Sequence, residues 1–268
     1  MPPVQERRRI GAILASVESA VDATRRVIEQ TRRLKTAVLQ DLLTRGLPGR
    51  HSEFREVKGL GQVPRAWKLI ELGTVTKLVT SGSRGWSQYI APTGSFFVRS
   101  QNIGLGEFRY DDVVFVQPPN NVEARRATIE PNDLLISVTG EPGNVAVATE
   151  GMGLAHVSQH VALVRLKKPE LARWLGVALA SPSGQRQFRS KMYGQTRPGL
   201  NLDNIDELRV AIPDEDERNQ LCEMVEVIHA RATQSIEHLR RLEQAKNALS
   251  QALLTGRVRT TQRLETSP

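Results

Sequence analysis

The stretch Lys35-Thr-Ala-Val-Leu-Gln-Asp-Leu-Leu-Thr44 near the start of the chain returns as Lys246-Asn-Ala-Leu-Ser-Gln-Ala-Leu-Leu-Thr255 near its end. The two copies lie 211 positions apart, and the same offset pairs Pro2 with Pro213 and Glu6 with Glu217 without any gap. A repeat of this kind at both ends of a 268-residue chain indicates that one structural element occurs twice and encloses the middle of the sequence.

Apolar residues recur in both copies at alternating steps of three and four, which is the spacing of coiled-coil helices. We predict one long spacer helix within residues 1–46 and a second within residues 213–256. The first, from about Pro3 to Thr44, would be about 60 Å long at 1.5 Å per residue. The predicted apolar seam is Ile10, Ile13, Val17, Ala20, Thr24, Val27, Thr31, Leu34 and Val38 in the first copy, and Leu221, Met224, Ile228, Arg231, Ser235, His238, Leu242, Ala245 and Leu249 in the second.

Between the helices the sequence changes to short β-like runs separated by Gly, Pro and Asn. A polar linker is predicted at 47–56, a domain at 57–212 and a flexible tail at 257–268. Because strands and helices do not alternate, the predicted fold class is α+β with one twisted mixed sheet. The predicted strands are 68–72, 76–79, 95–98, 112–115, 133–138, 144–148, 160–166 and 208–212, and the predicted short helices are 169–180 and 182–192.

Composition narrows the class of partner. The chain carries 37 Lys and Arg against 29 Asp and Glu, a formal charge of +8. This excess favours nucleic acid over a membrane, because no segment has an aromatic-rich apolar face. It is densest between Arg165 and Arg197, where Glu170 is the one acid. The single cysteine, Cys222, excludes a disulfide framework. Without a signal-like start or an 18-residue apolar run, a cytoplasmic location is expected.

Signatures of catalysis and cofactor binding are absent from the sequence. Gly104-Leu-Gly106 and Gly151-Met-Gly153 lack the third glycine of a dinucleotide fingerprint, and there is no phosphate-binding loop or nucleophile elbow. His156 and His160 are four residues apart but have no third ligand of metal type nearby. We therefore predict no catalytic residue and no metal site, and a chain whose function is to bind.

Five loops at predicted strand ends are rich in small polar and basic residues: 80–86, 99–103, 139–144, 158–160 and 194–201. Arg, Gln and Asn side chains match the major-groove edges of guanine and adenine, whereas Ser, Thr and backbone groups hold phosphates. The candidates for reading bases are Arg84, Arg99, Gln101, Asn102, Gln159 and Arg197. The candidates for phosphate contacts are Ser83, Thr139, Asn144, Lys191, Tyr193 and Asn201. Ordinary solvated turns are the alternative interpretation; the clustering of these loops in one domain with a basic flank favours DNA binding.

Motifs along nearly the whole chain resemble those of the DNA-specificity (S) subunits of type I restriction–modification systems. Gly61-Gln-Val-Pro-Arg-Ala-Trp-Lys68, followed by Glu71-Leu-Gly73, is similar to the entry into a target-recognition domain of that family. Three further segments resemble, in order, its Arg-x-x-Asn-Ile element, its Asp-x-Leu-x-Ser-x-Thr-Gly segment and the exit into a helical spacer: Phe97–Ile103, Asp133–Val147, and Gly199–Asn201 with Ile212, Pro213 and Glu217.

The resemblance implies a non-catalytic subunit that reads one half of a bipartite double-stranded DNA target. It implies two long spacer helices that pair as an antiparallel coiled coil. These helices would dock modification (methyltransferase) subunits, with a restriction (nuclease/translocase) subunit as a further candidate partner. S-adenosylmethionine is then expected on the methyltransferase subunit and no cofactor on this chain. Full-length family members carry two recognition domains, so this chain looks like a half subunit, or like a longer subunit without its first recognition domain.

Several alternatives remain open at the level of sequence. The helices could pair within one chain, or two copies or a second specificity half could associate. A coiled-coil adaptor whose middle domain binds protein is the second functional class. An enzyme in its own right is the third, and the missing cofactor and Asn/Asp-Pro-Pro-aromatic motifs disfavour it.

Overall fold

The computed structural model describes residues 3–194, 196, 198–255 and 257–258, and for Arg32 and Lys35 the backbone alone. The chain forms two compact units, one from Met1–Val38 with Glu226–Pro268 and the other from Leu39–Val225. Two long helices, α1 (Val4–Arg45) and α7 (Glu215–Leu254), belong partly to each unit. The predicted domain boundaries at 57 and 212 stay predictions.

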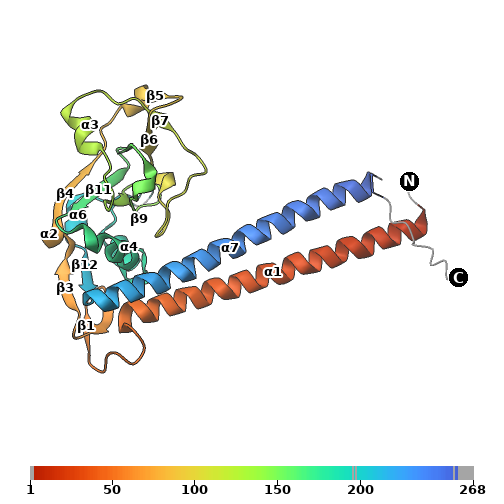
Figure 1. Cartoon of the computed structure of the whole chain (residues 1–268), viewed down its shortest axis with the longest axis horizontal. Coiled ribbons are helices and arrows are strands. Elements are labelled where there is room, and N and C mark those ends of the chain that lie inside the picture. The colour runs from red at the N-terminus through yellow and green to blue at the C-terminus, as the bar shows by residue number, and fades with distance from the viewer. Residues whose placement is uncertain (1–2, 195, 197, 256, 259–268) are drawn as a thin grey trace. The chain divides into compact units, whose positions relative to one another are not determined.

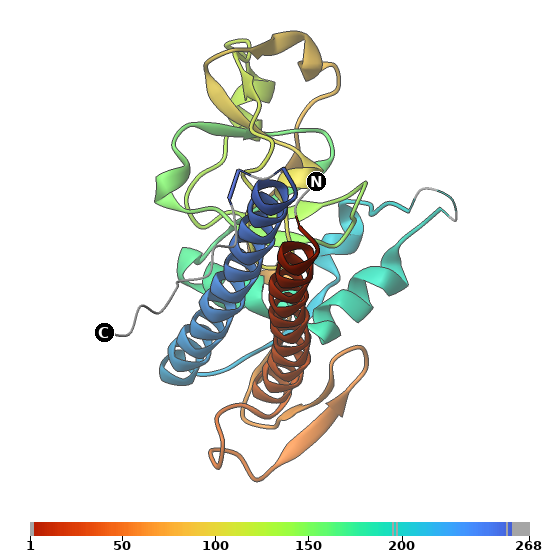
Figure 2. The same ribbon diagram turned by 90° about the vertical axis from the view of Figure 1, so that its right-hand side faces the viewer.

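In the first unit, α1 and α7 lie side by side and run in opposite directions (Figures 1 and 2). Arg25 of α1 forms an ion pair with Glu243 of α7 at 2.6 Å, and Glu18 forms one with Lys246 at 2.5 Å. As the residue number rises along α1, that of its partner on α7 falls, which defines the antiparallel pairing. These exposed ion pairs fix direction more than they add stability, because such pairs contribute about 0–1 kcal/mol each.

The register of the seam differs from the predicted one at alternate positions. Val21 is 1% exposed and Ile28 is also buried, whereas the predicted seam residue Val27 is 59% exposed. On α7, Ala232 is buried while the predicted Arg231 is exposed. From Ile10 and from Leu221, successive seam residues are thus four and then three positions apart (a four-three register), rather than three and then four (the predicted three-four register). Every second seam position therefore moves by one residue. Buried and half-buried positions follow this spacing in both helices: 10, 14, 17, 21, 24, 28, 31, 38 and 42, and 221, 225, 228, 232, 235, 239, 242, 246, 249 and 253.

The second unit contains two four-stranded sheets. One has the order β4 (Thr76–Ser81), β11 (Val161–Leu166), β8 (Leu134–Ser137) and β9 (Val145–Val147), with every pair antiparallel. The other has the order β10 (Ala155–Val157), β6 (Ser95–Val98), β7 (Phe115–Val116) and β5 (Ile90–Ala91), in which only β10 and β6 are parallel. The α+β class is confirmed, but the single mixed sheet is wrong, because the buried strands divide between two sheets.

Two smaller sheets flank these. The hairpin of β1 (Phe54–Val57) and β2 (Gly61–Pro64) lies within and after the predicted linker, and β3 (Lys68–Glu71) pairs with β12 (Arg209–Ile212). The short helices are α2 (Leu72–Val75), α3 (Val122–Ala127), α4 (Ala172–Ala180), α5 (Pro182–Lys191) and α6 (Asp203–Asp206). Single 3-10 turns are η1 (Trp86–Tyr89), η2 (Ser100–Asn102), η3 (Glu150–Met152) and η4 (Pro169–Leu171).

The core of the second unit lies on both faces of β8 and β11. Leu135 and Leu163 pack into a cluster with Phe96 and Val157 of the second sheet. Helix α4 covers strand β9, and Gly176 permits the close approach, since a Cβ there would lie 2.4 Å from Val147 Cγ2. A strand that is covered on both faces needs a continuous apolar run, which explains why β8 and β11 do not alternate in polarity.

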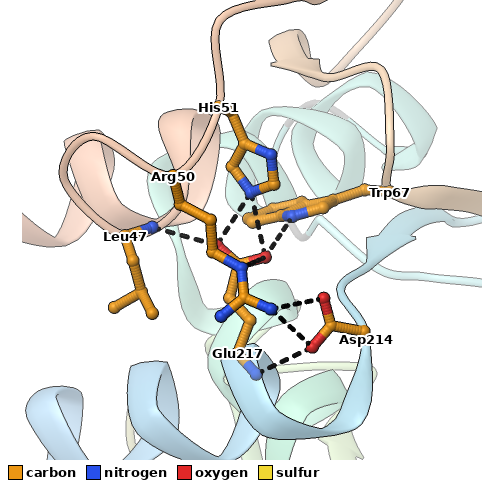
Figure 3. Close-up of polar contacts among 6 residues, drawn as sticks. All are labelled: Leu47, Arg50, His51, Trp67, Asp214 and Glu217. Carbon is orange, nitrogen blue, oxygen red and sulfur yellow. Dashed lines mark hydrogen bonds and ion pairs between the residues drawn. The ribbon is translucent and has the colours of Figure 1, made fainter.

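Within this unit, a buried carboxylate in the first turn of α7 is bonded to the segment that follows α1 (Figure 3). Glu217 in the first turn of α7 is fully buried and accepts hydrogen bonds from the Leu47 N–H (3.0 Å) and the Trp67 indole N–H (2.9 Å). His51 Nε2 lies 2.9 Å from both carboxylate oxygens, and Arg50 pairs with Asp214 at 2.8 Å. The segment that follows α1, predicted as an irregular linker, is therefore fixed by bonds to α7.

Candidate nucleic-acid interface

The five predicted loops lie next to one another at one edge of the sheets. The Gly82 N–H donates to Ser158 O (3.2 Å), and a Cβ on Gly82 would lie 1.9 Å from Val157 O, so only glycine permits this approach. Loop 139–144 is bonded to loop 158–160 through Thr139 and to loop 99–103 through Asn144. The backbone N–H of Leu200 donates to Val138 O (2.9 Å), which adds loop 194–201. Segments distant in sequence thus form one polar surface.

The loop after β6 is organised around Asp112. Arg99 donates through Nη2 to the Asp112 backbone carbonyl (2.9 Å) and also pairs with its carboxylate (2.9 Å). Gln101 Nε2 donates to the same carboxylate. Arg99 is half-buried and Gln101 is exposed, so both predicted base-reading side chains lie at the surface with a fixed partner.

Asn102 occupies a different position from the one predicted. Its side chain is buried at 1% exposure and is fully used within the loop. It accepts from the Arg99 N–H (3.0 Å) and donates to Arg109 O (3.2 Å) and Asp112 O (3.0 Å). This burial makes Asn102 a residue that shapes the loop, and direct base contact does not fit the structure.

Loop 139–144 presents a second network, around Glu141. Asn144 Nδ2 donates to Glu141 Oε2 (2.5 Å) and to Ile103 O (3.1 Å), and Arg109 Nη1 donates to the same carboxylate oxygen (3.0 Å). Thr139 Oγ1 lies 2.7 Å from His160 Nδ1. Both predicted phosphate-contact residues of this loop are half-buried and tied to neighbouring loops.

The two histidines that are four residues apart have different environments. His156 is buried beside Trp86 and Thr128, and burial lowers the pKa of its imidazole. His160 is exposed and lies 3.0 Å through Nε2 from Gln159 Nε2. In the described part of the chain, no three His, Cys, Asp or Glu side chains are grouped to hold a metal ion. The expectation of no metal site stays a prediction.

Loop 80–86 contains two of the predicted DNA-contacting residues, one with a hydrogen-bond partner and one without. Ser83 Oγ donates to Glu123 Oε2 of α3 (2.9 Å). Arg84 is exposed, and within the described residues it has neither an ion pair nor a hydrogen bond.

The last loop contains the remaining candidates. Lys191 forms an ion pair with Glu207, and Tyr193 is exposed and exchanges backbone hydrogen bonds with Gly199 (3.0 Å each). Asn201 is exposed, and its carbonyl accepts from the Asn204 N–H (3.2 Å). Arg197 lies outside the described residues.

The basic run between 165 and 197 is not uniformly available to a partner. Arg165 is bonded to Asp133 through Nε (2.9 Å) and Nη2 (2.8 Å). Burial raises the pKa of Asp133, an effect that the bonds from Arg165 and from the Glu130 N–H oppose. By contrast, Arg186 and Arg189 on α5 are exposed and unpaired within the described residues. Helix α5 contacts the 139–144 loop, because Gln185 Nε2 donates to Gly143 O (2.8 Å).

Four residues of this surface were not predicted from the sequence: Arg109, Asp112, Glu141 and His160. Glu141 and His160 lie inside the predicted 139–144 and 158–160 loops, so their position in the sequence was a signal for them. Arg109 and Asp112 lie six and nine residues beyond the 99–103 loop, and only tertiary contacts bring them to it.

No family model matches the chain. The chain is 19% identical over 97% of its length to the MjaVIII type I restriction enzyme specificity subunit of Methanocaldococcus jannaschii, covering 61% of that protein. It is 24% identical over 93% of its length to the EcoBI specificity subunit of Escherichia coli, covering 54% of it. The chain thus spans little more than half the length of these curated relatives.

Solved structures show the same fold. The HsdS subunit of Thermoanaerobacter tengcongensis superposes with a TM-score of 0.55 at 18% identity, covering 96% of this chain and 60% of that one. The S subunit of a type I restriction–modification system from M. genitalium gives 0.57 at 16% identity, covering 93% and 61%. Among the described residues, no helix has the length and apolarity to cross a membrane.

Proposed function

We propose that this chain, whose curated relatives over nearly its whole length are type I restriction enzyme specificity subunits, is a non-catalytic subunit that recognises one half of a bipartite DNA target. The observation that carries the proposal is the meeting of five polar loops on one surface, with Arg84, Arg99 and Gln101 exposed or half-buried there. Donor-rich side chains on a fixed scaffold are what base readout requires, because hydrogen-bond donors and acceptors must meet base edges in register.

In this proposal the long helices form an antiparallel coiled coil that sets the distance between two half-sites. The antiparallel ion pairs and the shared four-three seam support it. A rigid spacer fixes half-site separation, whereas a flexible linker would not. The same helices would offer the docking surface for modification subunits, which would carry S-adenosylmethionine, and for a restriction subunit.

The second half-site needs a second recognition domain, and the internal repeat indicates where it would dock. Leu43 near the end of α1 is 8% exposed, and it lines a small cavity with Leu60, Val63 and Trp174. Its counterpart in the repeat, Leu254 near the end of α7, is 69% exposed. The difference in exposure between the two copies supports a docking position at the end of α7. A second copy of this chain or a second specificity half would cover it.

Selection from a library of random duplexes tests the proposal. The full chain, alone and with its modification subunits, should enrich one short motif, and its affinity should fall steeply between about 50 and 200 mM salt. Incubation of the chain alone with DNA and labelled methyl donor should transfer no methyl group. A chain without any salt-dependent DNA affinity would favour the adaptor function instead.

A further inference from the structure

Two carboxylates lie within the proposed DNA-facing surface, and each bonds side chains that could read bases. Asp112 pairs with Arg99 at 2.9 Å and accepts from Gln101 Nε2. Glu141 accepts through one oxygen from Arg109 Nη1 (3.0 Å) and Asn144 Nδ2 (2.5 Å). The two networks are joined, since Asn102 bonds the carbonyls of both Arg109 and Asp112.

A contribution to stability does not explain these carboxylates. The side chains of Asp112 and Glu141 are each 59% exposed, and ion pairs at this exposure contribute little to the free energy of unfolding. A negative charge also opposes the approach of DNA phosphates. Their position within a surface that must attract a polyanion therefore calls for another role.

Orientation of the donors is the role that the geometry supports. A free arginine side chain samples many rotamers, and a guanidinium reads guanine only when its planar fork faces the O6 and N7 atoms. The Asp112 carboxylate and the Asp112 backbone carbonyl both bind Nη2 of Arg99, which fixes the plane of the guanidinium and leaves the two N–H groups of Nη1 to face a base. The Arg99 Nε is buried and has no partner among the described residues, which also limits the positions that this side chain can adopt.

We infer that Asp112 and Glu141 are positioning residues that determine sequence specificity. They hold Arg99, Gln101 and Arg109 ready for purine edges and disfavour the use of these donors on phosphates. Asn144, whose two amide hydrogens are already bonded to Glu141 and Ile103 O, helps to hold Glu141 in place. The inference rests on the proposed function and assigns a purpose to three donors of that surface. It requires guanine or adenine at the target positions that these side chains contact, because Arg matches guanine and Gln matches adenine.

The test compares Asp112→Asn and Glu141→Gln with two matched controls, Asp111→Asn and Glu107→Gln. Each control removes the same charge from an exposed neighbour that, within the described residues, makes no side-chain hydrogen bond or ion pair to these donors. The full chain is first used to select its motif from random duplexes. The affinity of each variant is then measured for the selected duplex and for single-base variants of it, with the thermal midpoint as a check of folding.

For Asp112→Asn and Glu141→Gln, binding to mismatched duplexes should strengthen while discrimination at one or two purine positions falls by about 5- to 150-fold. The controls should strengthen binding to all duplexes alike and keep the discrimination between matched and mismatched duplexes.

Equal behaviour of the variants and the controls would overturn the inference. A parallel loss of affinity for every duplex would also overturn it, because that result indicates a structural role. A wild-type chain that binds all duplexes alike overturns the proposed function, and this inference with it. A wild-type preference that survives both substitutions overturns this inference alone.

Discussion

Removal of the Glu217 carboxylate would leave the Leu47 N–H and the Trp67 indole N–H without their acceptor. A buried donor without a partner costs about 1–3 kcal/mol. Glu217→Ala should therefore lower the free energy of unfolding by about 3 kcal/mol or more, and Trp67→Phe, which removes one donor, by about 1–2 kcal/mol. Denaturant unfolding measures both. The control is Glu215→Ala, an exposed residue of the same helical turn; equal losses for Glu215→Ala and Glu217→Ala would refute the role given to Glu217.

Asp214 gives this junction a dependence on pH. The hydrogen bond from the Glu217 N–H, and then the charge of Arg50, lower the pKa of Asp214 below its ordinary value of 3.8. A carboxyl group with a lowered folded-state pKa stabilises the fold above its ordinary pKa, and the stabilisation is lost as the pH falls through the folded pKa. The stability advantage of wild type over Asp214→Asn should thus be full at pH 6 and shrink below about pH 4. Unfolding measured at several pH values gives this difference, and a constant gap from pH 6 to pH 3 would contradict it.

Residue identity predicted loop membership better than it predicted exposure. Asn102 and Arg99 stand three positions apart in one polar loop, yet Asn102 is buried and Arg99 is half-buried. The difference arises from the 3-10 turn Ser100–Asn102, which directs the Asn102 amide back onto the Arg99 N–H. Composition cannot show this, because a polar side chain that bonds the backbone and one that faces solvent have the same sequence signature.

At the scale of the element, the repeat predicted two long helices, but the chosen seam was one residue off at alternate positions. In α1 most of the alternate positions differ only by neighbours of equal polarity, such as Val27 and Ile28, and the pair Leu34 and Lys35 favours the three-four register, so periodicity in this copy did not indicate the four-three one. The second copy could have done so. There the four-three register places Ala232 and Leu239 on the seam, whereas the three-four register places Arg231 and His238 there.

Val21 and Val27 provide a matched test of this register, since both are valines of α1. Val21→Ala should lower stability by about 1.5–3 kcal/mol, because it removes buried methyl groups and leaves a cavity. Val27→Ala should change it by less than about 0.5 kcal/mol, because Val27 is exposed. Thermal unfolding followed by helix circular dichroism compares them. The predicted three-four seam would require the opposite order.

Helix α5 should bind phosphates without reading sequence. Arg186 and Arg189 are exposed on it, and it contacts the 139–144 loop. The double substitution Arg186→Gln and Arg189→Gln should weaken binding to all duplexes alike and reduce the slope of log affinity against log salt by about 2. Arg240→Gln with Arg241→Gln, which removes the same charge from α7, is the control. Unequal weakening among duplexes would instead assign base readout to α5.

At the scale of the whole molecule, the sequence predicted the α+β class and the two long helices, but not the division into two four-stranded sheets. The strands β10 and β5 are three and two residues long, too short for a periodic signal. The basic run was also overestimated as a binding surface. Arg165 and Lys191 lie in it but are paired with Asp133 and Glu207, and such pairing depends on tertiary contacts.

Leu254 tests the proposed association of two recognition domains. If a second copy covers the end of α7, the full chain should self-associate with increasing concentration, and Leu254→Asp should weaken that association. Val122→Asp is the control, because Val122 is equally exposed but lies on α3. Analytical ultracentrifugation of the three chains measures the effect. Self-association that is the same in all three would place the contact elsewhere.

The buried carboxylate of Glu217 has a practical consequence for chimeric subunits. Its hydrogen-bond donors come from residues 47–67, at the other end of the recognition unit's sequence, while the acceptor lies three residues beyond Asp214. A chimera whose transferred segment ends at β12 would contain the donors from one protein and the acceptor from another. A transferred segment that ends within α7, after Glu217, would keep all the hydrogen bonds of this carboxylate, so the proposed recognition domain should be exchanged at that point.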